Sequence, residues 1–224
     1  MNIHSATRAL FGAALLLASS FTIASAAGHT ITGRIVADNE VRIYTAVSEV
    51  PAMTVTYQGV SACWSTSVPV NINTTNRYLY LTCWSDLSVA QGLLHDLTVD
   101  GTPVYSGHSL WRVLPNDSVM AACTVPGAGV VEAAMASRIP TGTFVVPTVG
   151  CQNNATCYGV WGQSTLISSA AKWSWFNSGN QVSGNAPFQP GFNHREFLIF
   201  RLDMQQVATP TRLGSWGQIK TMYR

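Results

Sequence analysis

The sequence predicts an all-β protein, an antiparallel β-sandwich or jelly roll with little helix. Short runs rich in β-branched and aromatic residues recur about every ten residues, which is typical of such folds. Glycine, proline, asparagine and aspartate separate these runs and favour turns between them. No amphipathic helix of normal length appears in the sequence.

In the first half, alternating or apolar runs predict seven strands. The expected ranges are 29–36, 40–47, 53–57, 67–72, 77–84, 95–101 and 110–114. Residues 37–39 and the pair Asp100-Gly101 carry turn chemistry. The run from Arg77 to Trp84 is apolar on both faces, which predicts a central strand.

The second half is less regular. Strands are expected at 142–146, 171–176 and 196–203, and one short helix at 127–137. A long polar loop is expected from Ser178 to Asn193. We expect residues 27–224 to form a single β-sandwich domain, in which 115–160 is an insertion or part of a second small unit.

The first 26 residues have the order of a secretory signal peptide. Arg8 precedes an apolar run from Ala9 to about Ala18, and small residues gather at 24–27. This predicts cleavage after Ala26 or Ala27. The mature protein is then expected to be secreted or periplasmic, with association with the cell surface as an alternative. The later sequence contains no apolar stretch long enough for a transmembrane segment in the mature chain.

Charged residues make up only 10% of the chain, with a formal net charge of +2. The sequence contains no basic patch of the kind that binds phosphate backbones, which argues against nucleic acid as a partner. Asparagine, threonine, serine and glutamine supply the polarity instead. Such a surface suits neutral ligands that form hydrogen bonds, and it equally suits any exported β protein.

Five cysteines lie beyond the expected cleavage site, where export favours disulfides. Cys151 and Cys157 bracket a short polar loop, which predicts a local bridge. Cys63 and Cys83 each precede Trp-Ser, and a cross-strand bridge between them is about as expected as its absence. Cys123 is then left as a buried, inert thiol.

Several segments, in order along the chain, resemble the galactose-binding-like jelly rolls of secreted bacterial proteins. They are Ile35–Tyr44, Trp64, Tyr78–Asp86, Val89–Gly101, Ser106–Trp111, Ala171–Trp175 and the pair Phe200-Arg201. The resemblance implies a jelly roll and, for many members, sugar binding. The family's Asn-Gly turn is missing after Tyr44, and 115–160 has no counterpart, so fold alone does not assign a function.

Seven tryptophans are candidates for stacking on sugar rings. Those expected on strands are better explained by core packing: Trp64, Trp84, Trp111, Trp173 and Trp175. Trp161 differs, since it lies between Gly159 and Gly162 with no strand face to bury it. It is our aromatic candidate for a ligand site.

The loop before the last expected strand gathers four polar side chains: Asn193, His194, Arg195 and Glu196. They suit a polar ligand, although a surface ion pair and a capped turn explain them as well. Asp86, at the end of an apolar strand, is a candidate ligand for structural calcium or a turn cap. We expect no other cofactor.

The first hypothesis for function is a secreted, non-catalytic module that binds carbohydrate through loops at one end of the sandwich. The alternative is a structural or adhesive protein of the cell surface or matrix. A glycan-active hydrolase comes third, since glycoside hydrolysis needs only two well-placed carboxylates. The sequence lacks the common catalytic motifs, so an enzyme is not favoured.

Overall fold

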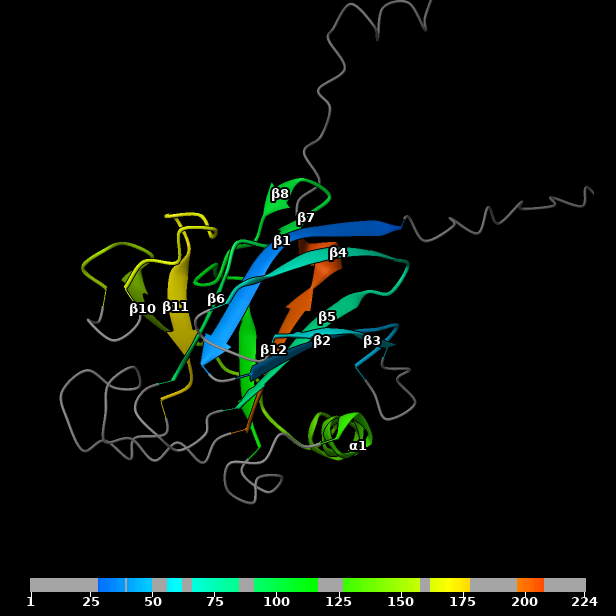
Figure 1. The fold of residues 1–224 in the computed structure, drawn as a ribbon. Helices are drawn as coiled ribbons and strands as arrows, with labels where there is room; N and C mark the ends of the chain where they lie inside the picture. The colour runs from blue at the N-terminus through cyan, green and yellow to red at the C-terminus, as the bar shows by residue number, and fades with distance from the viewer. Residues whose placement is uncertain are drawn as a thin grey trace, which may run out of the picture.

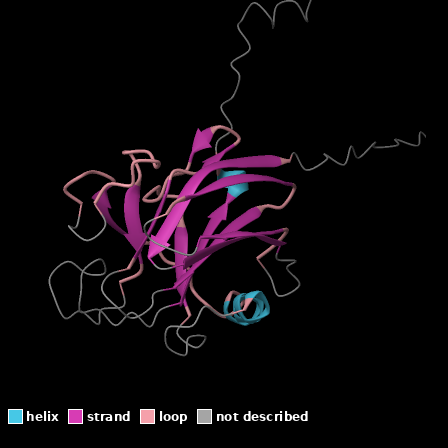
Figure 2. Ribbon diagram, in the orientation of Figure 1, coloured by secondary structure: helices cyan, strands magenta, loops and turns pink. Residues whose placement is uncertain are grey.

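The computed structural model describes residues 28–38, 40–49, 56–61, 66–84, 91–116, 127–157, 162–177 and 197–207. These residues form two antiparallel sheets packed face to face, with one α-helix, α1 (Ala128–Arg138), beside them (Figures 1 and 2). The predicted β-sandwich with little helix is therefore confirmed. The jelly-roll connectivity stays a prediction.

The larger sheet has seven strands. In spatial order it contains β10 (Thr148–Gln152), β11 (Lys172–Trp175), β6 (Gly92–His95), β1 (His29–Asp38), β7 (Thr98–Val99) and β8 (Thr102–Pro103), with β4 (Val68–Thr74) on the other edge of β1. The five-stranded sheet contains β3 (Thr56–Ser61), β2 (Glu40–Ala46), β5 (Tyr78–Trp84), β12 (Phe197–Asp203) and β9 (Arg112–Pro115). A short 3₁₀ helix, η2 (Met204–Gln206), follows β12.

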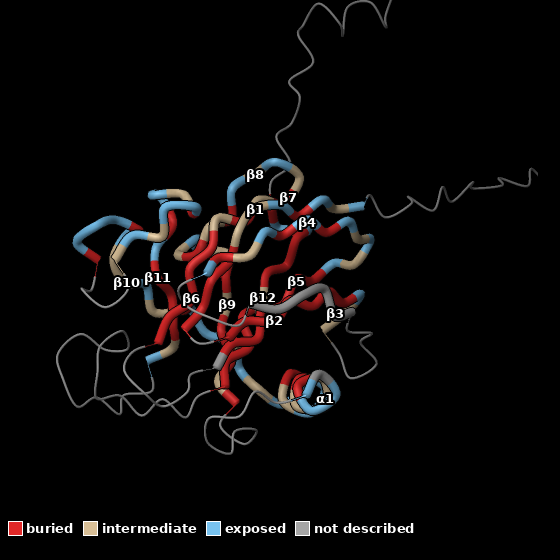
Figure 3. The backbone as a smooth tube through the Cα atoms, viewed as in Figure 1, coloured by how far each residue is buried: buried red, intermediate tan, exposed pale blue. Residues whose placement is uncertain are grey.

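Strand β5 confirms the predicted central strand, because β2 and β12 pair with it on its two sides. Its side chains alternate between two apolar layers, as a buried strand requires. Leu79 and Leu81 point into the core between the sheets, whereas Tyr78 and Tyr80 lie on the outer face. That outer face is covered by α1, through residues that include Met135 (Figures 1 and 3).

The core between the sheets contains three of the five tryptophans that were expected to pack there, and the side chains of Trp64 and Trp84 lie outside the described part. Trp111, Trp173 and Trp175 are all at most 2% exposed. The ring of Trp175 on β11 lies 6.4 Å, centroid to centroid, from that of Phe200 on β12, so it joins the two sheets. Core packing is thus confirmed for these three.

The predicted Asp-Gly turn is confirmed as the β7–β8 hairpin. Asp100 has φ 52° and Gly101 has φ 80°, the two positive values of a two-residue type I′ turn. The expected short helix also forms, at one residue's offset, as α1. Other boundaries differ. Strands β6 and β10 were not predicted, and the strand expected at 142–146 amounts to one isolated bridge, between Val113 and Val145.

Of the two predicted disulfides, one is confirmed. Cys151 and Cys157 are bridged, with Cα atoms 5.6 Å apart. Cys83 instead has a free, buried thiol. Cys63 lies outside the described residues.

Removing the confirmed bridge is expected to lower stability by about 2 kcal/mol, because it closes a loop of only a few residues. The double variant C151S/C157S should therefore unfold at a lower urea concentration than the wild type, with an unchanged slope. Cys83 should stay unreactive toward a thiol reagent in the native state of both proteins, since it is fully buried. An unchanged midpoint would show that the bridge does not stabilise the fold.

Candidate functional site

The residues predicted from sequence to bind ligand or metal lie outside the described part of the chain. They are Trp161, Asn193, His194, Arg195, Glu196 and Asp86, together with the thiols of Cys63 and Cys123. The strands beside two of these segments do end at the same end of the five-stranded sheet, since Trp84 at the end of β5 pairs with Phe197 at the start of β12. The predictions for these residues stay predictions.

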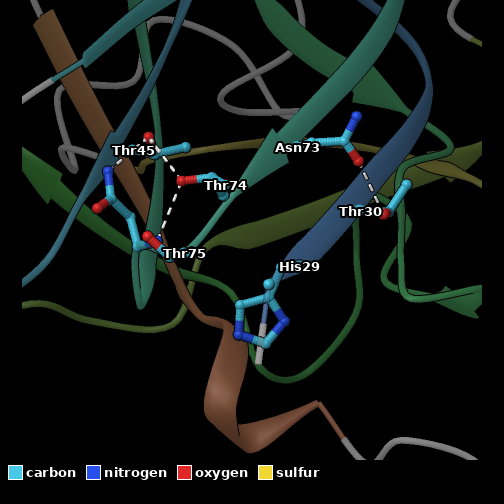
Figure 4. Close-up of a pocket in the computed structure, with 8 residues that line it drawn as sticks. His29, Thr30, Thr45, Asn73, Thr74 and Thr75 are labelled. Carbon is cyan, nitrogen blue, oxygen red and sulfur yellow. Dashed lines mark hydrogen bonds between the residues drawn. The ribbon is translucent and has the colours of Figure 1, made fainter. Parts of the chain in front are cut away.

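A polar hollow of about 600 Å³ opens at the opposite end of the sandwich (Figure 4). We call it the neutral hollow. Its lining is contributed by the start of β1, the end of β2, the end of β4 and the β4–β5 turn. The lining residues are Gly28, His29, Thr30, Thr45, Asn73, Thr74, Thr75 and Asn76.

The register of β1 against β4 creates this site. Because the strands are antiparallel, the first residues of β1 lie opposite the last residues of β4, with His29 facing Thr74 and Thr30 facing Asn73. Thr45 joins them from the other sheet, near the end of β2. The hollow therefore lies where the two sheets meet the turn that connects them.

Hydrogen bonds hold the lining in place. Thr30 Oγ1 donates to Asn73 Oδ1 at 2.9 Å, and Asn76 Nδ2 donates to Thr45 Oγ1 at 2.9 Å. The backbone N–H of Asn76 donates to Thr74 Oγ1 at 3.1 Å, which fixes the turn. Asn73 is exposed, and its amide nitrogen is left for a ligand, since its bond to Thr30 uses only the oxygen.

Among the described residues of the lining, His29 is the one with an ionisable side chain, and it is already paired. Its Nδ1 lies 2.8 Å from Asp100 Oδ2, and the other carboxylate oxygen accepts a hydrogen bond from the Thr30 backbone N–H at 2.8 Å. The Asp-Gly hairpin thus positions the imidazole at the rim. The described lining residues include no carboxylate.

Sequence reasoning missed this site, although a signal was present. Residues 71–76 read Asn-Ile-Asn-Thr-Thr-Asn, a dense run of neutral hydrogen-bonding side chains at the end of a strand. That run identifies a polar edge. It does not identify the partners on β1 and β2, which come from distant parts of the chain.

Within the described residues, no group of three histidine, cysteine, aspartate or glutamate side chains is placed to hold a metal ion. The calcium prediction rests on Asp86, so it is untested. A search of the described helices for one long and apolar enough to cross a membrane finds none.

Comparison with known proteins adds no relative. The chain matches no protein family, no curated protein and no solved structure at a significant level.

Proposed function

We propose that this protein is a non-catalytic binding module that holds a neutral, polyhydroxylated ligand, a carbohydrate, in the neutral hollow. One observation carries the proposal: the lining consists of hydroxyl and amide groups with a single, already paired imidazole. Sugar hydroxyls both donate and accept hydrogen bonds, and asparagine and threonine side chains do the same.

The hollow supports binding better than chemistry. Its size is that of an ordinary small-molecule site, about 600 Å³, and it is held open by bonds between its own residues. A lining fixed in advance loses less conformational entropy when a ligand arrives. No Phe, Tyr or Trp is among the described lining residues, and these would hold the ligand by hydrogen bonds rather than by stacking.

The same proposal includes export by the N-terminal signal and membership of the galactose-binding-like jelly rolls. The sandwich of two antiparallel sheets is compatible with that resemblance. Exported proteins meet free and surface-bound glycans, which fits a ligand of this kind.

Asn73→Ala is expected to weaken glycan binding about tenfold, because it removes the free amide donor at the rim. A glycan screen on the purified protein identifies the ligand, and calorimetry then compares the variants. Asn71→Ala is the matched control: Asn71 is an exposed asparagine on the same strand that does not line the hollow. Equal weakening by both variants, or no saturable binding to any glycan, would contradict the proposal.

The structural or adhesive alternative has its own support. Among the described strands, β4 pairs only with β1, so one of its edges is free to add a strand from another chain. Pro69 on β4 and the exposed asparagines beside it weaken that edge as a template. Sedimentation over a range of concentrations separates the two functions, since an adhesive subunit should self-associate and a soluble binding module should remain monomeric.

A further inference from the structure

A second hollow, of about 210 Å³, lies near the same end of the five-stranded sheet and differs in chemistry from the neutral hollow. We call it the charged hollow. In a chain with only 10% charged residues, it gathers three arginines, two acids and a tyrosine. These are Arg77, Arg112, Arg201, Glu49, Asp203 and Tyr78.

Two of the arginines face each other across adjacent strands. Arg201 on β12 and Arg112 on β9 are direct register partners, so their side chains leave the sheet on the same face. Like charges placed directly opposite one another destabilise a sheet. A pair of arginines in this position therefore needs negative charge between or beside the two guanidinium groups.

Arg201 is held firmly. Its guanidinium carbon lies 3.9 Å from the ring centroid of Phe144 and 5.7 Å from that of Tyr78, within the range of cation–π contacts. It also pairs with Glu49. Burial lowers the pKa of the Arg201 guanidinium from its ordinary value, since removal from water disfavours the charged form.

The acids in the hollow leave one cation uncompensated. Arg77 forms a bidentate ion pair with Asp203, with Nε 3.0 Å from Oδ1 and Nη2 2.6 Å from Oδ2. Arg201 pairs with Glu49. Arg112 instead donates from Nη1 to two backbone carbonyls, of Ser109 at 2.6 Å and Trp111 at 2.7 Å. Within the described chain it has no carboxylate partner, so its remaining N–H groups are available.

We propose that the charged hollow is a second binding site, for an oxyanion carried by a ligand, and that Arg112 is its main contact. Guanidinium groups bind carboxylate and sulfate oxygens through paired, charge-assisted hydrogen bonds. An oxyanion next to Arg112 would supply the missing negative charge and relieve the repulsion from Arg201. This site does not depend on a carbohydrate in the neutral hollow.

Glu49 has a particular role in this site. The side chain of Glu49 is 45% exposed, whereas that of Asp203 is 9% exposed and accepts two hydrogen bonds from Arg77. Glu49 is therefore the acid that an incoming anion can displace from Arg201. The proposal implies that Glu49 competes with the ligand, so its removal should strengthen binding.

The test uses sodium sulfate and sodium glucuronate as probes and glucose as the uncharged reference, at constant ionic strength. Binding is followed by NMR of the arginine Nε–H signals and by calorimetry. We expect saturable binding of at least one anion, and an affinity at least tenfold weaker in R112Q. We expect E49Q to bind several-fold more tightly than the wild type.

Arg34→Gln is the matched control, because that guanidinium also bonds a backbone carbonyl, of Ser67, but lies on β1 in the other sheet. It should leave the affinity unchanged. Since Arg112 also supports residues 109–111, E49Q tests the site in a protein that keeps those bonds.

The two probes distinguish the source of the oxyanion. Tighter binding of glucuronate indicates a carboxylate-bearing ligand, and tighter binding of sulfate indicates a sulfate ester. The proposal is overturned if neither anion saturates the wild type. Equal affinities for the wild type, R112Q and E49Q would overturn it as well, since binding would then lie elsewhere. Failure of this proposal would not affect the proposal for the neutral hollow, because Asn73 is not part of the charged hollow.

Discussion

Replacing Gly33 with alanine is expected to destabilise the protein by about 3–5 kcal/mol, enough to unfold a marginally stable domain. Gly33 has φ +138°, a conformation that residues with a side chain rarely adopt. A Cβ atom there would lie 2.6 Å from the carbonyl oxygen of Asp96 and 2.9 Å from Cα of Leu97. Both are backbone atoms, so the neighbours cannot move aside by a rotamer change.

The segment that crosses Gly33 is also fixed by hydrogen bonds. The Asp96 N–H donates to the Arg34 carbonyl at 3.1 Å, and the Arg34 N–H donates to Asp96 Oδ1 at 2.7 Å. Movement of this segment would break a contact between β1 and the loop after β6, which adds to the cost.

Urea unfolding of G33A measures the effect, with Gly129→Ala as the matched control. Gly129 lies in α1, and a Cβ atom there would contact nothing, so alanine should stabilise by about 0.5–1 kcal/mol. A loss below about 1 kcal/mol for G33A would show that β1 adapts at this position. It would also contradict the close approach as the reason for glycine.

Acidification is expected to destabilise the protein through His95. The imidazole is fully buried in the core, its ring edge-on to Trp111 with centroids 4.9 Å apart, and its Nδ1 has no hydrogen-bond partner. Burial lowers the pKa of His95 to about 3, because the charged form loses its hydration. The native state therefore keeps this residue neutral at pH values where the unfolded chain protonates it.

The direction in which stability changes with pH follows from the difference in proton binding between the unfolded and native states. Between pH 6.5 and about 3 the unfolded state binds a proton at His95 and the native state does not, so stability falls as the pH falls. The slope is about 1.4 kcal/mol for each pH unit, and the full loss approaches about 4–5 kcal/mol. Above pH 6.5 the residue is neutral in both states and makes no difference.

His95→Phe keeps an aromatic ring in the core and removes the titration. The variant should therefore lose less stability than the wild type between pH 6.5 and 4, measured by urea unfolding at each pH. Asp203, whose pKa is lowered by its ion pair with Arg77 despite opposing burial, adds acid sensitivity to both proteins alike. His108→Gln removes an exposed imidazole as a control. Parallel pH profiles for the wild type and H95F would rule out the buried histidine as the cause.

Local patterns predicted a large part of the fold. Asp100-Gly101 specifies a tight hairpin by its own backbone preferences, and the short polar loop between Cys151 and Cys157 brings those two thiols together. The apolar character of residues 77–84 on both faces predicted the central place of β5. Each of these features depends on residues close together in sequence, so the sequence alone is enough to find them.

Contacts between distant residues were not predictable in the same way. The repeated Cys-Trp-Ser strings, for example, carry no information on which strands lie beside β5. Strand β6 was missed because it has only four residues, and so short an apolar run does not by itself indicate a strand. The ligand-binding role predicted for residues 193–196 stays a prediction, because these residues lie outside the described part of the chain.

The sequence by itself determined the class of this protein: short strands, tight turns, a tryptophan-rich core and a weakly charged, amide-rich surface. The tertiary structure alone decided where the two hollows form. The neutral hollow exists because the register of β1 on β4 places His29 opposite Thr74, and the charged hollow because β9 pairs Arg112 with Arg201. The physical reason is that strand pairing joins residues far apart in the chain, and the energy that selects a register comes from the whole packed sandwich rather than from any one strand.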